Sequence, residues 1–198
     1  MNQKSIWSLN FTVALVLIPA VIGINYLGKL FAELLKLPLW LDSIGTVLAS
    51  MLAGPIIGAI SGIINNFIYG FTVNQISFVY AITNGIIGFV VGMMAYKGWI
   101  ANVKKAIVIG VVVGLVAATV STPLNMLFWE GQTGNIWGDA LYAVIIANDF
   151  PPWIASFCNS VVVDVPDKIA TVIISFLILK GLPTNLISMY NSQNKIER

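Results

Sequence analysis

Apolar residues occur along the chain in long runs separated by short polar breaks, a pattern that predicts helices crossing a lipid bilayer. Such a helix needs about 20 apolar residues to span the hydrocarbon core. No charged residue occurs between Asp42 and Lys97, or between Lys105 and Glu130. A soluble protein with uncharged stretches of this length would have too few charged residues on its surface to remain in solution. We therefore expect an integral membrane protein.

The apolar runs predict an all-α bundle of six transmembrane helices that forms a single membrane domain over residues 1–198. Breaks such as Gly54-Pro55 mark the turns, because proline cannot continue a helix yet suits the first turn of the next one. The first run has no convincing cleavage site and is interpreted as a retained span. The predicted spans lie near residues 9–31, 39–53, 55–71, 76–96, 104–128 and 164–182.

The fifth connection, which begins at Glu130, is long and partly apolar. Its segments 136–148 and 151–163 are too short to span the bilayer. We expect short interfacial helices there, lying at the membrane surface or folded over the helix ends. Pro166 favours a break before the last span. The alternative is a single kinked helix over 151–182.

The composition of the chain argues against several classes of function. The chain is 58% hydrophobic and 9% charged, with a net charge of +2, one cysteine and no histidine. The small net charge gives no reason to expect nucleic acid as a partner. The lack of histidine removes the most common general base and metal ligand. We therefore expect no enzyme activity, no cofactor and no metal site.

Lysine and arginine bias predicts a multi-pass protein of the cell membrane with both termini in the cytoplasm. With six spans and the amino terminus inside, the outer connections and adjoining helix ends hold only Lys29, Lys36 and Lys168. The inner segments hold the other basic residues, which are Lys4, Lys97, Lys104, Lys105, Lys180, Lys195 and Arg198.

Small residues and amides recur every fourth residue in the middle spans, so each set shares one helix face. Glycine at this spacing lets helix backbones approach closely in lipid. In the predicted orientation, the glycine ends lie toward the cytoplasm and the asparagine ends toward the exterior. The three sets are Gly54, Gly58, Gly62 and Asn66; Tyr80, Asn84, Gly88 and Gly92; and Gly110, Gly114, Ala118 and Thr122, with Asn125 one turn further.

This asymmetry predicts a ligand cavity that opens outward under the first and fifth connections, since polar side chains in a membrane face protein, water or ligand. For any one asparagine, the alternative is that it only joins helices by hydrogen bonds, at about 0.6 kcal/mol each. The predicted substrate-binding residues are Asn66, Asn84 and Asn125, then Asp42, Asp164 and Lys168, with flat contacts from Trp40, Phe67, Tyr80 and Trp129.

Lys168 has two interpretations. It could meet a substrate carboxylate, or it could form a salt bridge to Asp164 four residues away on the same face, which we favour. The glycine-packed inner half offers no polar pathway, and the sequence has no GxxxxGK[ST] phosphate motif. A binding protein that depends on a partner for energy is therefore expected, in preference to a channel or autonomous pump.

The segment LWLDSIGTVLASMLAGPIIGAISGIINNFIYG (39–70) resembles helices two and three of the substrate-binding S components of energy-coupling factor (ECF) transporters. The segment VVDVPDKIATVIISFLILKGLP (162–183) is similar to their last helix. The resemblance implies a bacterial membrane protein that captures a water-soluble vitamin or precursor from outside. Its implied partners are a transmembrane coupling protein (T component) and two ATPase subunits. Pantothenate is the first candidate substrate, and a pyrimidine precursor, pyridoxine or cobalamin could each replace it.

In this family the first helix often carries an AxxxA pattern that packs on the coupling protein. Here the comparable stretch 14–23 has no strict AxxxA, so the expected docking residues are Ala14, Pro19, Ala20 and Gly23. Ordinary helix packing is the alternative role for them.

Two other functions remain open. A membrane sensor or assembly subunit could use the same cavity without transporting anything. A small intramembrane enzyme could use Asp42, Asp164 or Asp167 as an acid or base, because burial can raise a carboxyl pKa. The absence of a paired catalytic motif or a metal signature makes the enzyme the least favoured interpretation.

Overall fold

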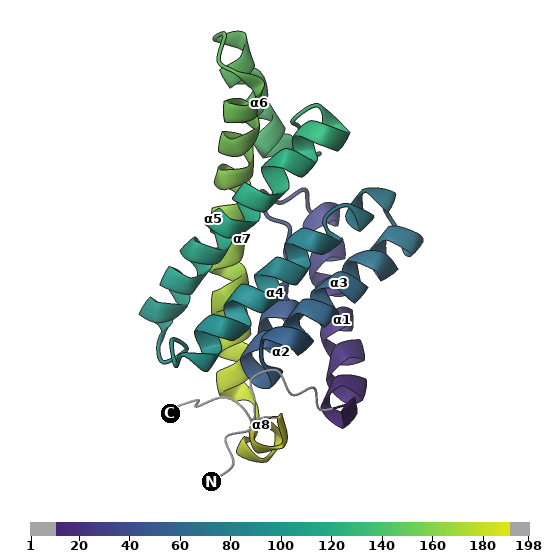
Figure 1. Ribbon diagram of the computed structural model, residues 1–198, viewed down its shortest axis with the longest axis vertical. Coiled ribbons are helices and arrows are strands. Elements are labelled where there is room, and N and C mark those ends of the chain that lie inside the picture. Colours follow the sequence, from purple (N-terminus) through teal and green to yellow (C-terminus); the bar gives the residue numbers. More distant parts are fainter. Residues whose placement is uncertain (1–10, 191–198) are drawn as a thin grey trace.

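The computed structural model describes residues 11–190, and that part of the chain folds into helices and short connections (Figure 1). The start of the first predicted span, both chain ends and the side chain of Ala14 lie outside the described residues. The elements in order are α1 (Phe11–Leu34), α2 (Ile44–Ala53), α3 (Pro55–Thr72), the 3-10 turn η1 (Gln75–Phe78), α4 (Ala81–Tyr96), α5 (Val103–Trp129), α6 (Ile136–Ala147), α7 (Pro152–Gly181) and α8 (Thr184–Tyr190).

The prediction of an all-helical fold is confirmed for the described residues. Within residues 11–190, three helical segments are both long and apolar enough to cross a membrane: Val16–Leu34, Pro55–Thr72 and Val103–Trp129. Helices α2, α4 and α6 are apolar but shorter. The six-span arrangement stays a prediction.

Helix α2 occupies the centre of the bundle. All of its residues are buried, and it contacts α1, α3, α4 and α7. Its 10 residues rise about 15 Å at 1.5 Å per residue, about half the thickness of the hydrocarbon core. The predicted span 39–53 therefore begins too early. Residues 39–43 form a non-helical connection, in which Leu41 has a left-handed backbone (φ 50°) that interrupts a helix.

The first turn of α2 is buried, so its backbone N–H groups need partners from elsewhere in the protein. Asn25 of α1 supplies them. Its Oδ1 accepts hydrogen bonds from the backbone N–H of Gly45 at 2.6 Å and of Thr46 at 3.2 Å. Its Nδ2 also donates to the Thr46 hydroxyl at 2.9 Å. One amide from a neighbouring helix thus fixes where α2 begins.

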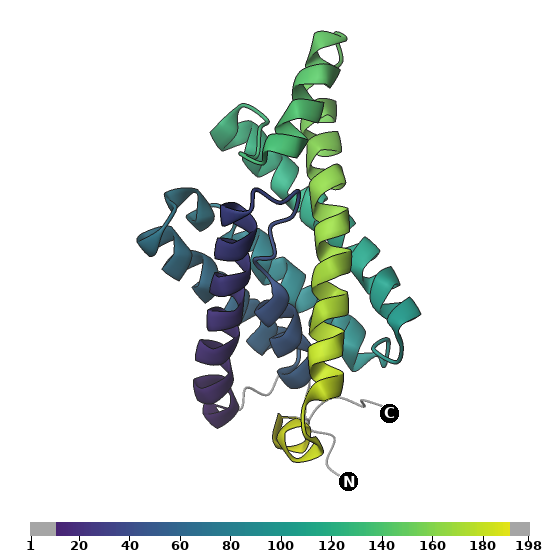
Figure 2. The ribbon, with the colours of Figure 1, turned by 180° about the vertical axis from the view of Figure 1, so that it is seen from behind.

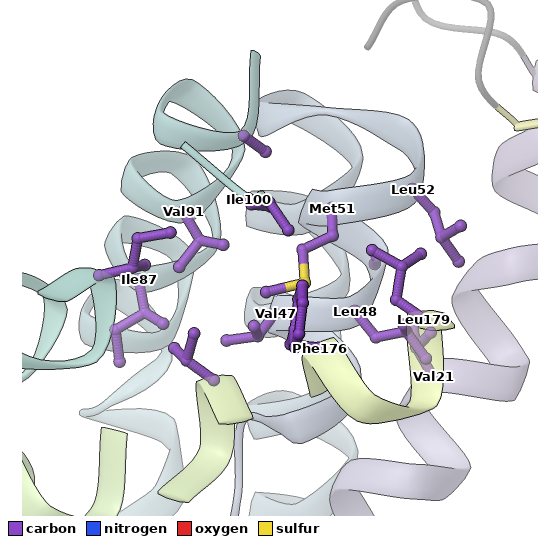
Figure 3. Close-up of a cluster of buried hydrophobic side chains, with 14 of the residues drawn as sticks. Val21, Val47, Leu48, Met51, Leu52, Ile87, Val91, Ile100, Phe176 and Leu179 are labelled. Carbon is purple, nitrogen blue, oxygen red and sulfur yellow. The ribbon is translucent and has the colours of Figure 1, made fainter. Parts of the chain in front are cut away.

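The hydrophobic core surrounds α2 at the end of the bundle near α8 (Figure 3). Val47 and Met51 of α2 meet Val91 of α4, and Phe176 and Leu179 of α7 close the cluster from another side. All five side chains are buried.

Glycines allow the closest helix contacts, as the spacing predicts. A Cβ atom added to Gly88 of α4 would lie 2.5 Å from the carbonyl carbon of Gly58 in α3. One added to Gly114 of α5 would lie 2.6 Å from the Cα of Val165 in α7. Such distances are too short for carbon atoms, so only glycine fits. The predicted close packing at these positions is confirmed.

Helix α7 runs without interruption from Pro152 to Gly181 (Figure 2). The expected break at Pro166 is wrong, and the alternative of one helix over 151–182 is correct. An interior proline costs a helix about 3 kcal/mol, but α7 packs against α5 more extensively than any other pair of helices pack together. This packing offsets the cost. The predicted span 164–182 is therefore the second half of a longer helix.

Helix α6 confirms the helix expected at 136–148, while the one expected at 151–163 is the first part of α7. Together α6 and the start of α7 form a hairpin that projects from the rest of the bundle (Figures 1 and 2). Its surface carries exposed apolar side chains, including Trp137, Val144, Phe150 and Trp153. Tryptophan at such positions is typical of a membrane–water interface.

Candidate ligand-binding site

A cavity of about 250 Å³ lies where the carboxyl ends of α1 and α5 meet the amino end of α4 and the middle of α7. The first connection contributes Trp40 and Asp42, and the fifth contributes Thr133 and Gly134. Both connections thus border the cavity, as expected. Ile87 and Ala117 belong to its lining and also to the hydrophobic core, so they mark its floor.

The structure brings most of the predicted binding residues to this cavity. Those in its lining are Trp40, Asp42, Tyr80, Asn84, Asn125, Asp164 and Lys168. Three others, Asn66, Phe67 and Trp129, are absent from the lining.

Asn66 is occupied by other helices. Its Oδ1 accepts a hydrogen bond from Nδ2 of Asn84 at 2.9 Å, and its Nδ2 donates to the Ser77 carbonyl at 3.1 Å. The side chain is buried. In this structure Asn66 therefore has the joining role that was the alternative for each asparagine. It positions Asn84, which does line the cavity.

Asn125 joins three elements. Its Oδ1 accepts a hydrogen bond from the Tyr80 hydroxyl, and its Nδ2 donates to the Ser160 hydroxyl at 3.0 Å. All three residues line the cavity. The indole nitrogen of Trp129 is buried near the Tyr80 hydroxyl, but outside hydrogen-bond geometry. Trp129 thus lies next to the lining residue Tyr80 without lining the cavity itself.

Phe67 lies away from the cavity. Its side chain is 45% exposed, and its ring packs edge-on against Phe78 with centroids 5.6 Å apart. It sits on the outer surface of α3, where an apolar side chain suits lipid.

The hydrogen-bond partners of Lys168 differ from the partner that we predicted from the sequence. Its Nζ donates to Oδ1 of Asp42 at 3.2 Å, to the Ser43 hydroxyl at 2.9 Å and to Oδ2 of Asp167. The favoured salt bridge to Asp164 is therefore wrong. The spacing along α7 suggested Asp164 as the partner of Lys168. Asp164 is a buried residue of the same helix, but the connection before α2 supplies Asp42 and Ser43 as partners instead.

Asp167 positions the first connection. Its Oδ1 accepts hydrogen bonds from the backbone N–H of Trp40 at 3.0 Å and of Leu41 at 2.8 Å. The fully buried carboxylate thus holds the segment that carries Trp40 and Asp42 into the cavity. It was not among the predicted binding residues.

Asp42 lies in the connection before α2, outside the helices. Burial alone would raise the pKa of its carboxyl group. The ammonium groups of Lys168 and Lys29 outweigh this effect and bring the pKa below its ordinary value. Asp42 is therefore a carboxylate at neutral pH.

Lys29 and Glu33 line the side of the cavity formed by α1. The Nζ of Lys29 donates to the Ser77 hydroxyl at 3.2 Å and lies 4.3 Å from the centroid of the Tyr69 ring. The Tyr69 hydroxyl donates to Glu33 at 2.7 Å. Lys29 could have been anticipated, since a lysine within a predicted span marks a functional position.

Serine and threonine side chains complete the lining, notably Thr83, Ser121 and Ser160. Their positions give no distinct signal in the sequence, because small hydroxyl residues are common in membrane helices. Ser160 also lies in the segment expected to stand outside the spans.

The fifth connection is fixed in place over the cavity by Asp139 of α6. Its Oδ1 accepts from the Thr133 backbone at 2.8 Å and from Nδ2 of Asn159 at 2.9 Å, and its Oδ2 accepts from the Gly134 backbone at 2.9 Å. The cavity-bordering residues Thr133 and Gly134 are thereby tied to the hairpin of α6 and α7.

Three of the four expected docking residues occupy the outer face of α1. Pro19, Ala20 and Gly23 are exposed, and Val16 and Leu27 beside them are exposed too. A Cβ atom added to Gly23 would meet no atom within 4 Å. This face is therefore exposed within the described chain, so close packing inside the bundle does not explain its small residues.

The cavity combines hydrogen-bonding groups, charges and aromatic rings without a metal centre: in residues 11–190 no group of three or more histidine, cysteine, aspartate or glutamate residues could hold a metal ion. Such a mixture is typical of sites that bind small organic molecules. No protein-family model, curated protein or solved structure matches the chain.

Proposed function

We propose that the protein is the substrate-binding S component of an ECF-type importer in a bacterial cell membrane. It captures a small water-soluble organic solute, of the size of a vitamin or vitamin precursor, from outside. The observation that carries the proposal is one cavity, lined by buried polar groups, at one end of an apolar helical bundle.

The distribution of charge supports the outward orientation. Lys97, Lys104 and Lys105 lie at the connection between α4 and α5, at the end of the bundle away from the cavity (Figure 1). Basic connections remain in the cytoplasm. The proposal therefore includes six passes through the membrane, made by α1 to α5 and α7, of which the central α2 is too short to cross the hydrocarbon core alone. The cavity faces the exterior and both chain ends lie inside.

The cavity floor supports dependence on a partner. Beneath Ile87 and Ala117 the described helices meet in apolar packing and in glycine contacts such as that of Gly58 with Gly88. A solute cannot pass through this packing without a large rearrangement of the helices. A coupling protein with ATPases would supply the energy, and the outer face of α1 around Pro19, Ala20 and Gly23 is the proposed docking surface.

The volume of the cavity limits the size of the solute that it can hold. Ligand pockets in proteins usually enclose about 300–1,000 Å³, and the cavity here, at about 250 Å³, is smaller. It suits a pyrimidine precursor, pyridoxine or pantothenate far better than cobalamin. Pantothenate gains no support from Lys168, because the ammonium group that could have met a substrate carboxylate is already bound by Asp42, Ser43 and Asp167.

Affinity purification of the tagged protein from native membranes tests the proposal. We expect a transmembrane coupling protein and ATPase subunits to copurify with it, and deletion of its gene to abolish uptake of one solute. Ligand binding without these partners and without an uptake defect would instead identify a membrane sensor. Absence of both partners and ligand would contradict the proposal.

A further inference from the structure

We propose that the cavity binds a small organic cation, whose positively charged group lies against the carboxylate of Asp164. This inference rests on the proposed binding function of the same cavity and specifies the charge of its ligand.

Asp164 is the buried carboxylate of the cavity lining that forms no ion pair within the described part of the chain. It lines the cavity and is only 8% exposed. Among residues 11–190, no ammonium or guanidinium group lies within ion-pair distance of it. The neighbouring Trp40 side chain is at most a neutral hydrogen-bond donor. Burial of a carboxylate without a paired cation is costly, so a cation in the cavity would stabilise this arrangement.

The charge of Lys168 reaches Asp164, but the two residues form no ion pair while Lys168 keeps its present contacts. An ammonium group has three N–H donors, and those of Lys168 are directed to Asp42, Ser43 and Asp167. Two of these partners are carboxylates, so the group of three charged residues is itself negative by one charge.

Lys29 does not reverse the balance. Its ammonium group already has the Ser77 hydroxyl and the face of the Tyr69 ring as partners. Glu33, one turn further along α1, adds a negative charge on the same side of the cavity. The positively charged residues of the lining are Lys29 and Lys168, and the negatively charged ones are Glu33, Asp42 and Asp164. With Asp167 behind them, negative charge exceeds positive charge.

Aromatic side chains complete a site of this kind. Trp40 lies beside Asp164, and both Trp40 and Tyr80 line the cavity. Aromatic faces attract cations through their quadrupole, and substituted ammonium ions are bound in this way by other proteins. A carboxylate with two aromatic neighbours therefore matches an ammonium or other nitrogen cation better than a carboxylate or phosphate ligand.

Three probes of equal bulk separate the possibilities. Choline carries a quaternary ammonium group, 3,3-dimethylbutan-1-ol is its uncharged carbon isostere, and 3,3-dimethylbutanoate is an anion of the same shape. Binding to the purified full chain is measured by thermal shift and by calorimetry. The variants are Asp164→Asn and, as a control, Asp149→Asn, which removes an exposed carboxylate from the connection between α6 and α7.

We expect choline to bind at least about tenfold more tightly than either other probe, a difference of about 1.4 kcal/mol. Asp164→Asn should abolish this preference and Asp149→Asn should preserve it. Tighter binding of the alcohol or the anion, or an unchanged preference in Asp164→Asn, would overturn the inference while leaving a ligand-binding cavity. Absence of binding by all three probes would contradict the cation site. If the purified protein also retained no solute from its native membranes, the proposed function would fail with it.

Discussion

The Nζ atom of Lys168 in α7 lies 3.2 Å from Oδ1 of Asp42, a residue 126 positions earlier in the chain. This ion pair joins the middle of the longest helix to the connection before the central helix α2. Because Asp167 binds the backbone of the same connection, two consecutive residues of α7 hold one wall of the cavity.

Replacement of Lys168 by methionine should destabilise the protein by about 3–5 kcal/mol, because it leaves the buried carboxylate of Asp167 and the partly buried one of Asp42 without their cation. Unfolding of the purified protein in mixed micelles, followed by circular dichroism, measures the change. Lys180→Met, at an exposed position near the end of the same helix, should change stability by less than about 1 kcal/mol. Equal effects of the two substitutions would contradict a structural role for the ion pair.

Asn84→Ala should weaken binding of the native solute far more than Asn102→Ala. Asn84 lines the cavity and donates to Asn66, whereas Asn102 lies at the opposite end of the bundle and accepts from the Lys105 backbone at 3.0 Å as the cap of α5. Loss of that cap should lower stability by about 1 kcal/mol without altering affinity. Isothermal titration with the solute recovered from wild-type protein provides the comparison, and equal affinities of the two variants would exclude the cavity.

Gly88→Ala should destabilise the bundle by about 1–3 kcal/mol through overpacking, since the new methyl group would meet the backbone of Gly58. The matched control is Gly23→Ala, also within a helix, where the space is open. Alanine should be neutral or slightly stabilising there, because it favours helix formation by about 1 kcal/mol over glycine. Melting temperatures of the two variants should therefore shift in opposite directions or by clearly different amounts.

The orientation of the bundle can be measured with a membrane-impermeant thiol reagent on intact cells. In a Cys158→Ser background, Gln132→Cys places a thiol beside the cavity, and Val103→Cys places one at the other end of the bundle. The Gln132→Cys variant should react in intact cells, and the Val103→Cys variant only after permeabilisation. The reverse pattern would place the cavity on the cytoplasmic side.

Much of the fold could be predicted from the sequence, because its strongest signals are local. The helical spacing of Gly58, Gly88 and Gly114 predicts close contacts wherever such helices meet, and the contacts are present. The continuation of α7 through Pro166 depends instead on packing between α5 and α7. A contact between two distant segments cannot be predicted from the residues next to the proline.

The candidate site likewise contains residues that could be predicted from the sequence and residues that could not. Asn84 and Asn125 follow the periodic pattern and line the cavity. The partner of Lys168 could not be predicted from spacing along one helix, since Asp42 reaches it from a distant connection. Asn66 occupies the same kind of periodic position as Asn84, but its side chain is hydrogen-bonded to Asn84 and to the Ser77 carbonyl and does not line the cavity. The periodicity identifies the buried face of a helix, and only the three-dimensional arrangement separates cavity wall from helix contact.

The most direct test of the account is mass spectrometry of small molecules retained by the protein purified from its native membranes. Two matched variants of α5 define the site: Ser121→Phe fills the cavity, and Thr119→Phe adds the same ring on the exposed face two residues earlier. We predict that one small organic molecule accompanies the wild-type protein and Thr119→Phe but is lost from Ser121→Phe. Equal retention by both variants, or no retained organic molecule in the wild type, would contradict the capture of a solute in this cavity.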